Sequence, residues 1–176
     1  MVGTSAKAVA NHFLKKYGET GITPLKIQKL VYIAHGWHLA VRGTPLVNDE
    51  RAEAWEYGPV YASLYHEFKH RGRLPILDLA TDFDENMKKF TPKIDHRDED
   101  ARKLLDRVWK VYGHMSGTQL SALCHQPGSP WDEARQMFPG IRNAHVDDDR
   151  IKIHYENKVE RNRAIHNAIH TAAQPA

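Results

Sequence analysis

Apolar residues recur every three or four positions along most of the chain, a spacing that places side chains on one face of an α-helix. The first such segment ends near Gly18. The second begins at Thr23-Pro24, an N-cap residue followed by proline at the first helical position, and ends at Gly43. Its apolar residues spread well beyond a single stripe, so we expect this second helix to lie at the centre of the core.

Further helices are expected from the same spacing and from residues that cap or break helices. Ser116 and Gln119 match a capping box, in which each side chain bonds the other residue's backbone. The helices that follow the central one are expected to begin at Pro59, Asp98, Ser116 and Ser129.

Three segments depart from the helical spacing. In residues 44–58, Asn48-Asp49 supplies turn chemistry between two short segments, which favours a small β-hairpin. Residues 73–97 contain two prolines and an acidic stretch, which indicates an irregular, mostly exposed connection that could hold a short helix. Residues 151–155 alternate as a strand would, and helical spacing returns from Val159 onward.

Together these patterns predict a mainly α fold: a compact single-domain bundle of about six or seven helices with a minor β-hairpin. The length of 176 residues suits one domain, and neither a linker nor an internal repeat divides the chain. A composition of 41% hydrophobic and 27% charged residues is that of an ordinary globular protein.

The charge balance indicates which class of partner the protein binds, and the cysteine content indicates the cellular compartment. The 25 Lys and Arg against 22 Asp and Glu leave a net charge of +3, which argues against nucleic acid as the partner. Cys124 is the single cysteine, so no intramolecular disulfide can form. We find neither the apolar core of a signal peptide nor a run near the roughly 20 apolar residues of a membrane span. The sequence therefore predicts a cytoplasmic protein without a membrane segment.

The chain holds 12 histidines, and two of them belong to a metal-binding pattern, His66-Glu67-Phe68-Lys69-His70. On a helix, histidines four residues apart project from one face and could bind zinc, with the glutamate as general base. A zinc-dependent hydrolase that uses His66 and His70 is therefore the alternative function.

The expected packing of the third helix opposes that zinc site. At 100° per residue on a helical wheel, His66 lies roughly 160° and His70 roughly 120° from the apolar centre at Leu64. The longer zinc-protease pattern also fails, because Ile76 stands where a third histidine should. The competing interpretation is a solvated helix face on which Glu67 pairs with Arg71 at i+4. We expect no cofactor and no catalysis.

Two groups of sequence blocks resemble a known family, the Panacea domain, also called the SocA-like antitoxin domain, which includes phage-associated relatives. The first group is PLKIQKLVY at 24–32, GWHLA at 36–40, GTPL at 43–46 and EAWEYGPV at 53–60. The second is VWKVYG at 108–113, LSAL at 120–123, His125-Gln126 and Pro130-Trp131. Because the resemblance extends to about residue 156, we expect a family domain at 1–156 and a C-terminal helical tail at 157–176.

The resemblance implies a helical antitoxin that neutralises a toxin, typically encoded beside it, by direct protein–protein contact. One family member instead acts as an adaptor that delivers its toxin to an ATP-dependent protease, so a protease complex is a second partner that the resemblance allows. Family members are not known as metallopeptidases. The tail at 157–176 could dock on the core, pair two subunits as a homodimer, or contact the toxin.

The segment from Glu53 to Pro59 is the expected recognition site, because aromatic anchors dominate the binding energy of interfaces. A structural role competes with this interpretation: Trp55 could fill the core, and Tyr57 and Tyr61 suit an interface or an interior equally. The candidate toxin-binding residues are Trp55, Tyr57, Pro59, Tyr61, Tyr65 and Arg71.

Overall fold

The computed structural model describes residues 4–172, with side-chain burial up to residue 164. Within that range it contains seven α-helices, two short 3-10 helices and two β-hairpins, which confirms the expected fold class. The α-helices are α1 (Ala6–Tyr17), α2 (Pro24–Arg42), α3 (Ala62–Phe68), α4 (Glu99–Tyr112), α5 (Gly117–Cys124), α6 (Pro130–Met137) and α7 (Asp148–Ala172). The shorter elements are η1 (Gly18–Thr20), η2 (Lys69–Arg71), β1 (Glu53–Trp55), β2 (Gly58–Val60), β3 (Asp82–Phe83) and β4 (Lys89–Phe90).

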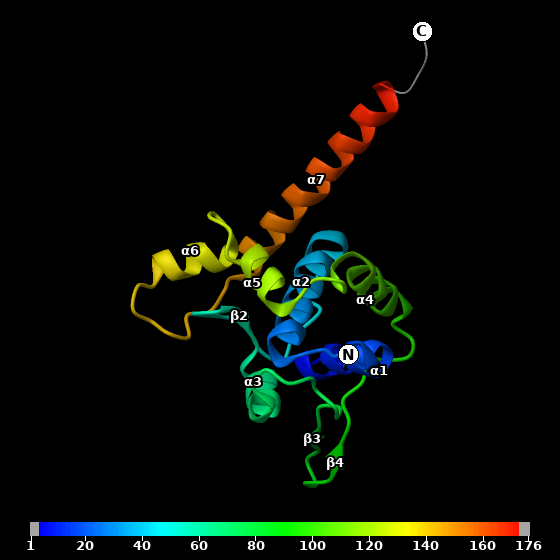
Figure 1. Cartoon of the computed structure of the whole chain (residues 1–176), viewed down its shortest axis with the longest axis vertical. Coiled ribbons are helices and arrows are strands. Elements are labelled where there is room, and N and C mark those ends of the chain that lie inside the picture. Colours follow the sequence, from blue (N-terminus) through cyan, green and yellow to red (C-terminus); the bar gives the residue numbers. More distant parts are fainter. Residues whose placement is uncertain (1–3, 173–176) are drawn as a thin grey trace.

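Helix α2 lies at the centre, as its broad apolar surface predicts, and α1, α3, α4, α5 and α7 pack around it (Figure 1). All of its residues from Ile27 to Gly36 are buried. The helix begins where the Thr23 side chain accepts a hydrogen bond from the backbone N–H of Lys26. It ends at Gly43, whose left-handed φ of 73° suits a residue without a side chain.

Three later helices begin at the capping residues that the sequence indicates. The side chains of Asp98 and Ser129 accept hydrogen bonds from the first turns of α4 and α6. Ser116 and Gln119 form the complete capping box at the start of α5. These local signals are reliable because each depends on a side chain bonding backbone groups only three residues away.

The β1–β2 hairpin overlaps the end of the expected region and extends past it to Val60, and Asn48-Asp49 does not form its turn. The strands pair antiparallel, with Glu53 opposite Val60, so Glu56-Tyr57 makes the turn. The Asp49 carboxylate instead accepts a hydrogen bond from the backbone N–H of Ala6 at 3.1 Å, at the start of α1. Because Pro59 belongs to β2, the third helix begins at Ala62 rather than at Pro59.

Two other expectations are corrected. The connection at 73–97 contains the short β3–β4 hairpin and no helix, and this hairpin projects from the domain (Figure 1). Residues 151–155 belong to α7, because Ile151 and Tyr155 lie one turn apart and are both buried while Ile153 is exposed. Helix α7 runs through residue 156 without a break, so the expected boundary falls inside a helix. The last four residues of the expected tail lie outside the described residues.

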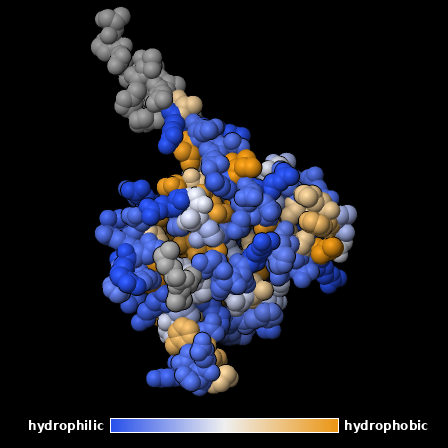
Figure 2. Space-filling model, turned by 180° about the vertical axis from the view of Figure 1, so that it is seen from behind, coloured by the Kyte–Doolittle hydropathy of each residue, from blue (hydrophilic) through white to orange (hydrophobic). Residues whose placement is uncertain are grey.

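The surface is mostly hydrophilic on the face shown in Figure 2, with hydrophobic side chains gathered at the outer end of α6 and on the projecting β3–β4 hairpin. Met137 and Phe138 are exposed at the end of α6, and Phe83 and Met87 are exposed on the hairpin. Among residues 4–172, no helix combines the length and the apolar character needed to cross a membrane.

Candidate binding surface

Three of the six candidate residues come together on one surface, which we call the hairpin surface: Trp55, Tyr57 and Tyr65. The rings of Trp55 and Tyr65 meet edge to face, with centroids 4.7 Å apart. Tyr57 occupies the hairpin turn and is 68% exposed, and Tyr65 on α3 is 41% exposed. The sequence therefore identifies three aromatic side chains that are partly or largely accessible to a partner.

These aromatic side chains line a cavity of about 460 Å³ between the first turns of α2, the hairpin and α3. Leu25 and Leu64 also line it and make its walls apolar, and Lys69 adds a positive charge. A concave apolar site with a few polar groups is the usual form of a binding site. The hairpin surface thus combines exposed aromatic groups with a recess that a partner's side chain can enter.

Two adjacent residues of α2, Gln28 and Lys29, hold the hairpin in place by hydrogen bonds to its backbone and to the residue that follows it. The Gln28 side chain accepts a hydrogen bond from the backbone N–H of Tyr61 at 2.9 Å and donates one to its carbonyl at 3.0 Å. The ammonium group of Lys29 donates to the carbonyl of Pro59 at 2.9 Å. Lys29 is fully buried, and this burial lowers its pKa to about 8. Sequence reasoning missed both residues, although two polar residues within an apolar helix were a usable signal.

Helices α5 and α6 hold the hairpin from the other side. Ser121 donates a hydrogen bond to the carbonyl of Tyr57 at 2.8 Å, and the Trp131 indole donates to the carbonyl of Trp55 at 2.7 Å. Gly58 has a φ of +101°, and a Cβ there would lie 2.8 Å from the Lys29 nitrogen. A glycine is therefore required where the backbone passes over the buried lysine.

Pro59 and Tyr61 differ from the expectation of a surface role. Pro59 is buried, and Tyr61 is 1% exposed, with its hydroxyl group unpaired among the described atoms. Its ring packs 6.3 Å from that of His35. These two residues fill the interior beneath the hairpin, where a partner cannot touch them in this conformation. Arg71, in η2, binds the carbonyl of Pro75 through two guanidinium nitrogens at 2.9 and 2.7 Å and so closes a local turn.

The zinc alternative finds no support in the arrangement of His66 and His70. Both histidines are exposed, and α3 ends at Phe68, so His70 falls in the following 3-10 helix. Glu67 pairs with Lys7 at 3.2 Å rather than with Arg71, and it accepts a hydrogen bond from the backbone of Thr81. Within the described residues, no group of three or more His, Cys, Asp or Glu side chains could hold a metal ion.

Comparison with known proteins finds a family model and a similar protein that match much of the chain. Residues 27–132 match the family model described as "Antitoxin SocA-like, Panacea domain". Antitoxin SocA from Caulobacter vibrioides (strain NA1000 / CB15N) is 39% identical over 129 residues, which cover 72% of this chain and 68% of that protein. No solved structure matches the chain. The matched range includes both strands of the β1–β2 hairpin and all of α3.

Proposed function

This chain belongs to the SocA-like antitoxin family defined by the Panacea domain, and from that premise we propose that it neutralises a toxin by binding it directly through the hairpin surface. An antitoxin role follows from the family. The proposal adds where and how the toxin is bound. The two proteins form a stoichiometric complex centred on Trp55, Tyr57 and Tyr65, and the antitoxin blocks the toxin by occluding it.

The observation that carries this proposal is the exposure of Tyr57 beside an apolar cavity. A tyrosine that is 68% exposed adds little to the stability of the isolated domain, yet its backbone carbonyl is held by Ser121. The aromatic residues are thus presented on a fixed support. Tyrosine and tryptophan in such settings contribute much of the energy of protein interfaces, because they bury a large area and lose little entropy.

Replacement of Tyr57 by alanine tests the proposal. We expect Tyr57→Ala to weaken binding to the toxin encoded beside this chain by about 30-fold in Kd, which corresponds to about 2 kcal/mol for an interface anchor. Binding is measured by calorimetry with the two purified proteins, so that no protease is present. Growth rescue by co-expression gives a second readout.

The matched control is Ile153→Ala, which removes another largely exposed apolar side chain, from α7 and away from the cavity. This variant should bind as the unmodified chain does. Both variants should unfold at the same denaturant concentration as the parent, because neither side chain is buried. The absence of any complex with the neighbouring toxin would contradict the proposed function, and an unchanged Kd for Tyr57→Ala would remove the hairpin surface from it.

A further inference from the structure

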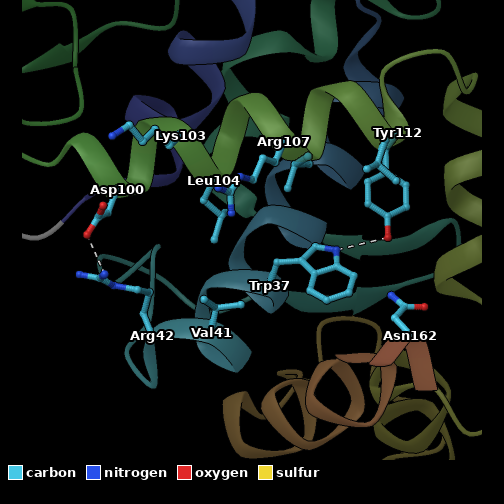
Figure 3. Close-up of a pocket in the computed structure, with 11 residues that line it drawn as sticks. Trp37, Val41, Arg42, Asp100, Lys103, Leu104, Arg107, Tyr112 and Asn162 are labelled. Carbon is cyan, nitrogen blue, oxygen red and sulfur yellow. Dashed lines mark hydrogen bonds and ion pairs between the residues drawn. The ribbon is translucent and has the colours of Figure 1, made fainter. Parts of the chain in front are cut away.

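A second recess lies at the opposite end of α2, between α2, α4 and α7 (Figure 3). We call it the α2–α4 groove. Its volume is about 470 Å³, and its apolar wall consists of Trp37 and Val41 from α2 and Leu104 and Val111 from α4. Val41 is 62% exposed and Val111 is 56% exposed. These exposed valines, one on each side of the groove, form an apolar surface that no described part of the chain covers.

Trp37 lies at the base of this groove in a fixed orientation. Its indole N–H donates a hydrogen bond to the Tyr112 hydroxyl at 3.2 Å (Figure 3). Its ring meets that of Tyr155 edge to face, with centroids 5.2 Å apart. A partner that covers the indole therefore need not order it first, which lowers the entropic cost of association.

The charged residues along the groove are mainly basic. Arg42, Lys103 and Arg107 line it, and Asp100 is its single acidic residue within the described chain. Asp100 is already paired with Arg42 at 2.7 Å. Lys103 pairs with Glu99 on the exposed side of α4, where an ion pair contributes little. Arg107 forms no ion pair with any described residue. The groove thus favours an occupant that carries carboxylates beside its apolar side chains.

We propose that the α2–α4 groove binds an acidic amphipathic helix of the toxin, a second contact that rests on the proposed function. Apolar side chains at i and i+3 or i+4 of that helix cover Trp37, Val41 and Val111, as in other complexes that hold a helix in a groove. Its flanking carboxylates face Lys103 and Arg107. Both groups of residues belong to the range that matches the family model.

The charge pattern argues against the tail of a second copy as the occupant. Within residues 157–164, α7 carries Lys158, Arg161 and Arg163 against a single acid, Glu160. A basic helix would be repelled by Lys103 and Arg107. A toxin can reach both sites, because the 19 residues of α2 span about 28 Å, close to the diameter of a small domain.

Charge reversal on α4 tests this second contact. We expect Arg107→Glu and Val111→Glu each to weaken binding to the purified neighbouring toxin by about tenfold in Kd. The first places a carboxylate where the occupant carries its own, and the second places an unpaired carboxylate against the occupant's apolar side chains. Lys110→Glu is the matched control, because Lys110 is exposed on the same helix and does not line the groove. Val41→Glu, on α2, provides an independent variant, and urea unfolding of each protein shows that it remains folded.

The outcomes separate the groove from the hairpin surface. Weaker binding of the groove variants with unchanged binding of Lys110→Glu supports the proposal. If only Tyr57→Ala weakens binding, the groove contact is overturned and the proposed function stands. If Lys110→Glu weakens binding as much as Arg107→Glu does, the effect is one of net charge and the groove contact is again overturned. If no complex forms with any variant or with the parent, both proposals fall.

Discussion

Lys29 places an ammonium group in the interior, and among the described residues only the Pro59 carbonyl accepts a hydrogen bond from it. Its pKa of about 8 lies well below the value of about 10.4 for a free lysine, because burial disfavours the charged form. Keeping the charge inside costs about 3 kcal/mol of folding free energy at neutral pH, at 1.36 kcal/mol per unit of pKa. In return, the hydrogen bond fixes β2 and hence the position of the Tyr57 turn.

The titration of Lys29 makes stability depend on alkaline pH. Between about pH 8 and pH 10.4 the unfolded chain binds more protons than the folded chain, so the free energy of unfolding rises with pH in this window. We expect the unmodified chain to gain about 2 kcal/mol relative to Lys29→Met between about pH 8 and pH 10.

Urea unfolding at several pH values measures this difference. Burial raises the pKa of Cys124 to about 11, which has the opposite effect on stability in the alkaline range. Both proteins contain Cys124, so the effect of its burial is common to them. The variant lacks only the Lys29 charge, which lowers the pKa of the thiol. Parallel pH profiles for the two proteins would show that Lys29 is not buried in its charged form.

Helix α7 can pack against α2 only because position 36 carries no side chain. A Cβ on Gly36 would lie 2.2 Å from the ring of Tyr155. Next to Gly36 on α2, the His35 imidazole bonds the Asp148 carboxylate of α7 at 3.1 Å and accepts a hydrogen bond from the backbone N–H of Val47 at 3.2 Å. The close approach and the polar contact together set how the two helices lie against each other.

Gly36→Ala tests this packing. In an isolated helix alanine is more stable than glycine by about 1 kcal/mol, but the clash with Tyr155 should reverse the sign and give a net loss of about 1–3 kcal/mol. The free energy of unfolding is measured in urea, together with that of Tyr155→Leu and of the double variant. The double variant should lose less than the sum of the two single losses, because the smaller side chain relieves the clash. Additive losses would contradict the contact.

The first turns of α7 complete the hydrophobic core, although they lie beyond the residues that match the family model. The matched range ends at residue 132, yet Ile151 and Tyr155 of α7 belong to the buried core. Figure 1 shows α7 packed at its first turns against the other helices and then projecting away from them. The two ends of this helix therefore differ: the first packs on the core, and the second extends away from it.

A pair of truncations separates these roles. A chain that ends at residue 147 exposes the face of α2 that Ile151 and Tyr155 cover, and we expect it to lose cooperative thermal unfolding, because removal of each such side chain costs about 2–5 kcal/mol. A chain that ends at residue 164 keeps all of the described buried side chains and should unfold cooperatively. Circular dichroism during heating distinguishes the two. Cooperative unfolding of the shorter chain would show that α7 is not part of the domain.

The sequence by itself determined the helical class, the central position of α2 and the starts of several helices. These features depend on local patterns, such as Thr23-Pro24 and the capping box of Ser116 and Gln119, in which the interacting groups lie within one turn of each other. The sequence also identified Trp55, Tyr57 and Tyr65 as candidates, because aromatic residues beside a turn suit an interface.

Only the tertiary structure decided which of the remaining aromatic residues lie inside and what supports the site. Tyr61 is buried because Gln28, 33 residues earlier, holds its backbone against α2. The alternation of residues 151–155 fits a strand or a helix, and the α2 surface at Gly36 selects the helix. Lys29 meets Pro59 only after the chain has folded back on itself. Such contacts join residues far apart in the chain, so neither periodicity nor capping can reveal them.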